Sequence, residues 1–178
     1  MENIVDKMLK IATKAHAGQL RKWNDNVPYI VHPIGVAEKV KTLEGVNEVD
    51  IAAAIGHDIL EDCGEHWASV IEEECGREVL DLVRELTFET EGAEWANRSR
   101  AEKNVVRFRH MERMTLRAKR LKMVDRWYNL NDMKNAPYKL IKKTVDESWK
   151  LLEICGEADK EMAKDLEDAI KNMERRLN

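Results

Sequence analysis

Apolar residues recur along this chain mostly at spacings of three and four, and this periodicity limits its possible folds more than any other feature. Such spacing places apolar side chains on one face of an α-helix, where they can pack into a core. Residues 158–176 are the clearest case, because charged residues cover the face opposite the apolar one. The pattern predicts an all-α fold of about nine or ten helices, over residues 3–18, 33–44, 48–62, 66–75, 77–88, 99–112, 115–135, 138–155 and 158–176.

Residues that start or stop helices support these boundaries. Pro33 suits the first turn of a helix, and Asn47 is expected to cap the next one. Two stretches, 19–31 and 88–98, have no helical period and are predicted to be irregular. Several helical patterns stop at a glycine, as C-terminal caps do: Gly18, Gly45, Gly76 and Gly156.

The length and composition fit one folded unit. The chain has 178 residues, of which 43% are hydrophobic, so it can bury a sizeable core. No repeat, low-complexity segment or shift in composition marks a linker. Residues 1–178 are therefore predicted to form a single compact domain.

Charge and cysteine content exclude several classes of protein. A net charge of −4 gives no electrostatic reason to expect a nucleic-acid or anionic-membrane partner. The longest apolar run, Ile51 to Gly56, is far shorter than a membrane span, and the N-terminal MENIVDKMLK lacks the apolar stretch of a signal peptide. Three cysteines without a CxxC pair fit a reducing compartment, so a cytoplasmic protein is expected. The oligomeric state is left open.

Phosphate-binding glycine loops and the nucleophile elbow of serine hydrolases have no counterpart in the sequence. The candidate chemistry lies in histidines and carboxylates instead.

The strongest anomaly is IAAAIGHDILED, residues 51–62, where an apolar run leads into His57, Asp58, Glu61 and Asp62. Buried carboxylates are costly unless they are paired or bind a cation. Gly56 weakens a helix and suggests that another part of the chain approaches closely beside His57. The alternative is a helix end that turns polar where it reaches solvent.

A second anomaly is a polar stripe on the helix predicted over 115–135. Lys122, Asp125, Asn129 and Asp132 follow one another at spacings of three, four and three, with apolar residues between them. The stripe is either a solvated edge or the wall of a polar cleft.

A third group lies near residues 15–33. Arg21 and Lys22 are predicted in a loop after Gly18, and His32 stands directly before a helix start. His32 could also serve only as a helix cap, and an Arg-Lys pair in a loop is a common surface feature. His16 is interpreted as a structural histidine.

Together the three groups provide two imidazoles and two carboxylates, from His32, His57, Asp58 and Asp125. Mixed nitrogen and oxygen ligands without thiolate suit a divalent ion such as Mn²⁺, with Fe²⁺, Co²⁺ and Zn²⁺ as alternatives. Four protein ligands would leave room for water and a substrate oxygen, as attack of metal-activated water on phosphorus requires.

The chain resembles the HD-domain phosphohydrolases, and within them the small RelA/SpoT-type alarmone hydrolases. The resemblance is carried in order by AHAGQLRK (15–22), PYIVHP (28–33), AAAIGHDILED (52–62), ECGREVLDLVRELT (74–87) and LKMVDRWYNL (121–130). It implies a compact all-α fold and hydrolysis of the 3′-pyrophosphate of ppGpp or pppGpp, usually with Mn²⁺, to give GDP or GTP plus pyrophosphate.

The resemblance also implies roles for individual residues. The metal ligands would be His32, His57, Asp58 and Asp125. Glu61 and Asp62 match a pair that positions and activates the attacking water. The groups that face the nucleotide would be Arg21, Lys22 and Asn129.

Three positions depart from the family pattern: Cys63 stands in place of Thr, Asn26 in place of Gly, and Asn131 in place of an Arg. Two other functions are considered beside alarmone hydrolysis. One is an HD-type phosphatase of another nucleotide, such as a 2′-phosphorylated nicotinamide dinucleotide or a nucleoside monophosphate. The other is a nucleotide-binding module without catalysis.

Overall fold

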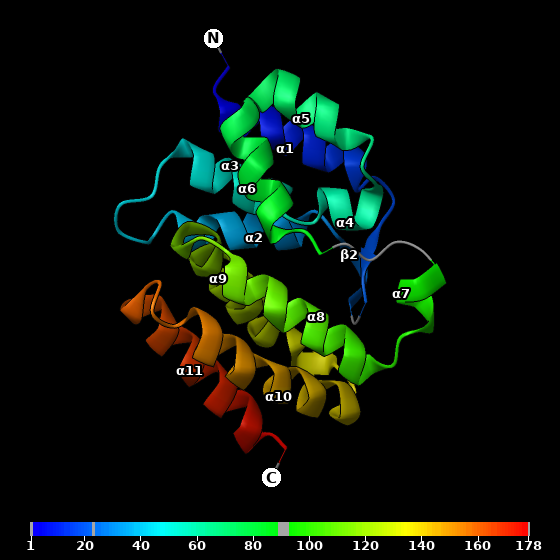
Figure 1. The fold of residues 1–178 in the computed structure, drawn as a ribbon, viewed down its shortest axis with the longest axis vertical. Coiled ribbons are helices and arrows are strands. Elements are labelled where there is room, and N and C mark those ends of the chain that lie inside the picture. Colours follow the sequence, from blue (N-terminus) through cyan, green and yellow to red (C-terminus); the bar gives the residue numbers. More distant parts are fainter. Residues whose placement is uncertain (1, 23, 89–92, 178) are drawn as a thin grey trace.

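The computed structural model describes residues 2–22, 24–88 and 93–177 (Figure 1). These residues form eleven α-helical segments, one short 3₁₀ helix and a two-stranded antiparallel hairpin. The elements are α1 (Ile4–Ala15), β1 (Leu20–Arg21), β2 (Asn24–Pro28), α2 (Val31–Val40), α3 (Glu48–Gly56), α4 (Ile59–Cys63), α5 (Trp67–Cys75), α6 (Arg77–Leu86), α7 (Ala93–Asn97), α8 (Arg100–Arg113), α9 (Leu116–Asp132), η1 (Met133–Asn135), α10 (Tyr138–Cys155) and α11 (Lys160–Arg175).

The all-α prediction is confirmed. The nine helices longer than five residues each lie within or overlap one of the nine predicted ranges. Local capping explains why they begin where they do. The side chain of Asn47 accepts hydrogen bonds from the backbone N–H groups of Val49 and Asp50, and the Asp50 carboxylate accepts one from the backbone N–H of Asn47. Gly76 ends α5 with a φ of 92°, a conformation that glycine adopts without strain.

Several boundaries differ from the predictions. Helices α1, α2 and α9 end at Ala15, Val40 and Asp132, three or four residues before the predicted ends at 18, 44 and 135. The helix expected over 48–62 is broken, because α3 ends at Gly56 and α4 begins at Ile59, with His57 and Asp58 at the junction. The stretch 19–31 holds the β1–β2 hairpin, in which Leu20 pairs with Pro28, and α2 begins at residue 31 rather than 33. The stretch 88–98 holds the short helix α7. Residues 23 and 89–92 of these stretches lie outside the described residues.

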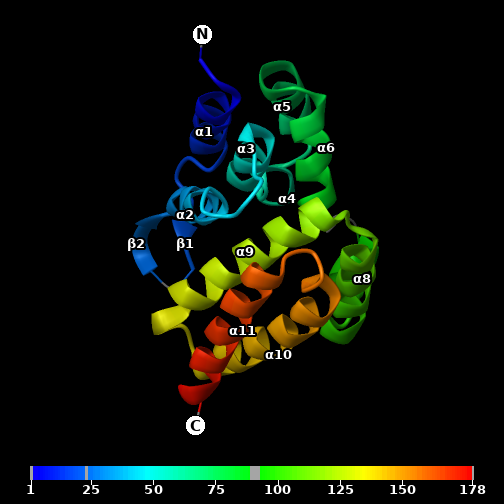
Figure 2. The same ribbon diagram turned by 90° about the vertical axis from the view of Figure 1, so that its left-hand side faces the viewer.

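Helix α9 runs through the middle of the molecule, with α1, α3, α5 and α6 on one side and α10 and α11 on the other (Figure 2). It packs against α2, α6, α10 and α11, while α3 packs against α1, α2 and α6. Asp125 therefore lies on the central helix, and His32 and His57 lie on elements that pack around it.

Two glycines allow close approach at these crossings. A Cβ atom at Gly35 of α2 would lie 2.1 Å from the Tyr128 ring of α9. A Cβ atom at Gly56 would lie 2.9 Å from Sδ of Met8 in α1, so the close approach expected beside His57 is present. The contact at Gly35 brings α2 and α9, which carry His32 and Asp125, nearer than a larger side chain would permit. No helix within the described ranges is long and apolar enough to cross a membrane.

Candidate functional site

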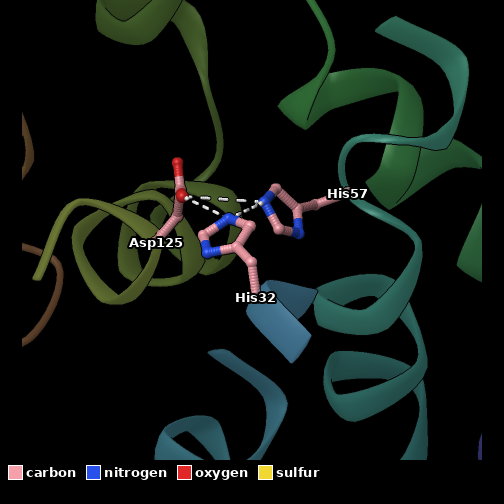
Figure 3. A group of neighbouring side chains, drawn as sticks. All are labelled: His32, His57 and Asp125. Carbon is pink, nitrogen blue, oxygen red and sulfur yellow. Dashed lines mark hydrogen bonds and ion pairs between the residues drawn. The ribbon is translucent and has the colours of Figure 1, made fainter. Parts of the chain in front are cut away.

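His32, His57 and Asp125 point toward one another from three different elements (Figure 3). One donor atom from each lies within 4.8 Å of the other two. Nε2 of His32 is 3.3 Å from Nε2 of His57 and 3.2 Å from Oδ1 of Asp125. All three side chains are buried, with exposed fractions of 1%, 3% and 9% for the residues in chain order.

Asp58 joins this group from the junction between α3 and α4. Its Oδ2 lies 3.0 Å from Nε2 of His57 and 3.5 Å from Nε2 of His32. The Tyr29 hydroxyl donates a hydrogen bond of 2.5 Å to the same oxygen. The four residues expected as metal ligands, His32, His57, Asp58 and Asp125, thus lie together and are called the His–Asp cluster below.

Local contacts orient the cluster. Nδ1 of His57 lies 2.8 Å from the carbonyl oxygen of Ala54, one helical turn earlier, so this nitrogen carries the proton and Nε2 is turned toward the cluster. Asp125 is held from its own helix, because Asn129 donates to Oδ1 at 2.6 Å and Lys122 lies 3.3 Å from Oδ2.

The electrostatics of the His–Asp cluster favour positive charge. Burial by itself lowers the pKa of His57, but the carboxylates of Asp58 and Asp125 outweigh it and raise that pKa to about 10. Burial likewise disfavours the charged forms of Asp58 and Asp125. The charge of His57 nevertheless holds the pKa of Asp58 well below its usual range, and Lys122 does the same for Asp125.

These residues fit a divalent cation. Ligands at neighbouring corners of an octahedron, with bonds of about 2.1 Å, lie about 3 Å apart. The four separations between imidazole nitrogens and carboxylate oxygens here are 3.0–3.6 Å. Two imidazoles and two carboxylates form a borderline-hard donor set that suits Mn²⁺, Fe²⁺, Co²⁺ or Zn²⁺.

A cavity of about 300 Å³, the central cavity, opens onto the cluster and is also lined by Glu61 and Asp62. The backbone N–H of Phe88 approaches Oε2 of Glu61 at 3.5 Å. Burial raises the pKa of the Glu61 carboxyl, an effect that Lys122 opposes and Asp58 reinforces. Both carboxyl groups expected to act on water therefore share one cavity with the ligands.

The nucleotide-facing candidates line a second cavity of about 410 Å³, the hairpin pocket, which shares Lys22, Tyr29, Asp62 and Asn129 with the central cavity. Lys22 is exposed at the turn of the hairpin. Arg21 differs from it, because Arg21 is 6% exposed and donates to Asp132 at 2.9 Å and to Asn129 at 3.1 Å. The polar stripe of α9 is thus the wall of a cleft rather than a solvated edge.

Sequence reasoning did not assign roles to three residues that the structure places around the cluster. Tyr29 and Lys122 contact its carboxylates, and Arg107 of α8 lines the central cavity. Tyr29 lies three residues before His32 and Lys122 three before Asp125, a helical spacing that contained a signal. Arg107 has none, because only the packing of α8 brings it to the site. His16 lies outside the cluster, with Nδ1 2.8 Å from Oε1 of Gln19.

Comparisons with known proteins identify the family of the chain. The model of the HD domain family matches residues 9–152. A Xenopus tropicalis protein named guanosine-3′,5′-bis(diphosphate) 3′-pyrophosphohydrolase is 31% identical over 124 residues, which cover 69% of this chain and 65% of that protein. A probable GTP pyrophosphokinase of Mycobacterium leprae is 39% identical over 85 residues, 48% of this chain and 10% of that one. The matched segment thus spans slightly under two thirds of the frog protein.

A solved structure shares the fold over the whole chain. It was described under the heading "A metazoan ortholog of SpoT hydrolyzes ppGpp and plays a role in starvation responses". The two structures superpose with a TM-score of 0.84, covering 100% of this chain and 98% of the other at 22% sequence identity. At that identity the likeness establishes the fold.

Proposed function

Because the chain belongs to the HD-domain family, we propose that it is a metal-dependent phosphohydrolase that removes the 3′-pyrophosphate of guanosine alarmones. The observation that carries the proposal is the convergence of two imidazoles and two carboxylates on a cavity that also holds Glu61 and Asp62. The activity named for the frog relative supports the choice of ppGpp or pppGpp as substrate.

The His–Asp cluster would hold the metal, for which we propose Mn²⁺. A divalent ion bound there would supply an activated water molecule and offset the negative charge of the phosphate. His57 and Asp125 enter this role already oriented, by the Ala54 carbonyl and by Asn129 with Lys122. Preorganised ligands avoid the cost of ordering side chains during the reaction.

Glu61 and Asp62 would take the proton of the attacking water. The oxygen of that water forms a bond to the phosphorus attached to the 3′ oxygen, and the bond from phosphorus to the 3′ oxygen breaks. The 3′ oxygen leaves with a proton, so the products are GDP or GTP and pyrophosphate. A half-buried carboxyl with a raised pKa, such as Glu61, accepts a proton more readily than an exposed one.

The hairpin pocket would bind the nucleoside. Lys22 offers an exposed cation to an anionic nucleotide. Arg21 would act differently from the sequence expectation, because its guanidinium is bound to Asp132 and Asn129 and so fixes the position of Asn129. We further propose that residues 1–178 act as one domain in the cytoplasm, on a small nucleotide rather than on nucleic acid.

A nucleotide panel tests this function. The purified protein is incubated with ppGpp, pppGpp, a 2′-phosphorylated nicotinamide dinucleotide and nucleoside monophosphates, each with Mn²⁺, Mg²⁺ or chelator. Ion-exchange chromatography separates the products. We expect GDP or GTP and pyrophosphate in equal amounts from the alarmones, in samples that contain metal. Release of phosphate from the other nucleotides, with the alarmones intact, would show the second candidate function and overturn the first.

A further inference from the structure

A third cavity lies on the other side of the central cavity from the hairpin pocket. Its volume is about 410 Å³, and Phe88 and Arg107 line both it and the central cavity. Its wall is aromatic and basic, with Trp95 and Arg98 among its residues. We call it the Arg107 pocket. Figure 2 shows the hairpin and α8 on opposite sides of the molecule, with α9 crossing between them.

Arg107 is held in this wall by aromatic rings. Its guanidinium carbon lies 5.8 Å from the centre of the Phe88 ring and 5.7 Å from that of Trp95. Its Nε is buried and has no hydrogen-bond partner within the described ranges. Stacking of a guanidinium on aromatic faces fixes its plane and leaves its N–H groups directed outward at the edge.

Two neighbouring cations, Arg84 and Lys122, are already engaged. Arg84, in the same wall, forms an ion pair with Glu65. Nζ of Lys122 lies 4.8 Å from the centre of the Phe88 ring and 3.3 Å from Oδ2 of Asp125. No carboxylate lies within ion-pair distance of Arg107 in the described part of the chain, so its charge is available to an anionic ligand.

The order of the three cavities predicts how a bound substrate is oriented. The hairpin pocket and the Arg107 pocket each share residues with the central cavity, which holds the His–Asp cluster. This step rests on the proposed function: with the nucleoside in the hairpin pocket and the reacting phosphorus at the cluster, the next phosphate points toward Arg107. We propose that Arg107 binds the terminal phosphate of a substrate diphosphate, and therefore the pyrophosphate that leaves.

Such a contact would select diphosphates over monophosphates. A monophosphate ends at the cluster, whereas a diphosphate extends one phosphate farther toward the Arg107 pocket. A guanidinium binds phosphate oxygens through two parallel N–H groups, a geometry that lysine and glutamine do not reproduce.

Pyrophosphate itself is the probe for this proposal. Calorimetry measures binding of pyrophosphate and of inorganic phosphate to the Mn²⁺-loaded protein, and metal content is measured for every variant. Arg107→Gln removes the charge but keeps a polar side chain of related shape. Arg109→Gln is the matched control, because it makes the same change at an exposed position of α8.

We expect the unaltered protein to prefer pyrophosphate over phosphate, and Arg107→Gln to weaken pyrophosphate binding about 10- to 100-fold while phosphate binding stays within about twofold. Arg109→Gln should bind both anions as the parent does. Arg107→Lys, which keeps the charge and most of the packing, should fall in between and carries the test if Arg107→Gln folds poorly.

Equal pyrophosphate affinity in Arg107→Gln, Arg107→Lys and the parent would overturn the proposal, as would a parent without preference for pyrophosphate. The proposed function fails separately. If the protein does not hydrolyse ppGpp but Arg107→Gln still loses the preference for pyrophosphate, the subsite stands and the assigned substrate is wrong.

Discussion

The His–Asp cluster and the rim of the site differ in how their side chains are held. His32, His57 and Asp125 are at most 9% exposed, come from helices packed in the core, and are tied by hydrogen bonds or ion pairs. The rim, formed by the hairpin turn at Lys22 and by Arg107 of α8, rests on aromatic stacking or reaches into solvent. The difference suggests that the His–Asp cluster performs the reaction and that the rim determines substrate specificity.

Loss of a ligand should have the largest effect. His57→Ala removes a donor and leaves Asp58 and Asp125 facing each other without their central partner. We expect loss of bound metal and a fall in activity of more than about 10³-fold, since a metal ion contributes several kcal/mol to the transition state. Elemental analysis and initial rates measure both. The control is His66→Ala, at an exposed histidine next to α5.

Metal should also stabilise the core. At a free Mn²⁺ concentration about 100 times the dissociation constant, binding adds about 2.7 kcal/mol to the free energy of unfolding. The parent protein should therefore melt at a higher temperature with Mn²⁺ than with chelator, and His57→Ala should lose this difference. If the parent protein melts at the same temperature with Mn²⁺ and with chelator, the assignment of a metal site to the His–Asp cluster is wrong.

The second largest effect is expected at the carboxyl groups proposed to act on water. Glu61→Gln and Asp62→Asn keep shape but cannot accept a proton, so kcat should fall about 10²- to 10⁴-fold with metal content unchanged. Glu73→Gln, an exposed carboxyl on α5, is the control. If both site variants hydrolyse ppGpp at the parent rate, these catalytic roles are wrong.

The pH profile sharpens the same test. Burial raises the pKa of Glu61, with Lys122 opposing and Asp58 reinforcing the shift, so its basic form is lost at a higher pH than for an exposed glutamate. Because a base works only when it is deprotonated, kcat should decline as pH falls through that raised pKa. Glu61→Gln should lose this limb of the profile, while Glu73→Gln should retain it.

A third, intermediate effect tests the packing that builds the cluster. Gly35→Ala would place a Cβ 2.1 Å from the Tyr128 ring and so force α2 and α9 apart or displace the ring. Overpacking of this kind costs about 1–3 kcal/mol of folding free energy. Chemical denaturation measures the loss, and the double variant with Tyr128→Leu should recover most of it. Equal stability of Gly35→Ala and the parent would mean that the crossing is not tightly packed.

The smallest effect is expected at the rim. Lys22→Ala should raise KM about tenfold and leave kcat, metal content and stability near the parent values, because an exposed cation contributes to nucleotide binding and little to packing. Arg21→Ala should also lower stability, since it leaves the partly buried Asp132 carboxylate without this guanidinium. Lys164→Ala, an exposed lysine on α11, is the control. If the Arg21 and Lys22 variants have the same KM and the same stability, the different roles proposed for these two residues are wrong.

Local sequence patterns are enough to predict the helices and the chemical character of the site. Helix position follows from contacts between residues three and four apart and from caps such as Asn47, and these are local. The carboxylates that follow the apolar run at 51–56 indicated a cation site, because a buried charge needs a partner in any fold.

How these parts meet depends on the packing of the helices. The break at His57 and Asp58, the ion pair of Arg21 with Asp132 and the place of Arg107 beside the central cavity all depend on residues far apart in the chain. Arg21 and Asp132 are 111 positions apart, and no local period records such a contact. Local spacing specifies which side chains share a helix face, but the crossing of α2, α3 and α9 specifies which faces share a cavity.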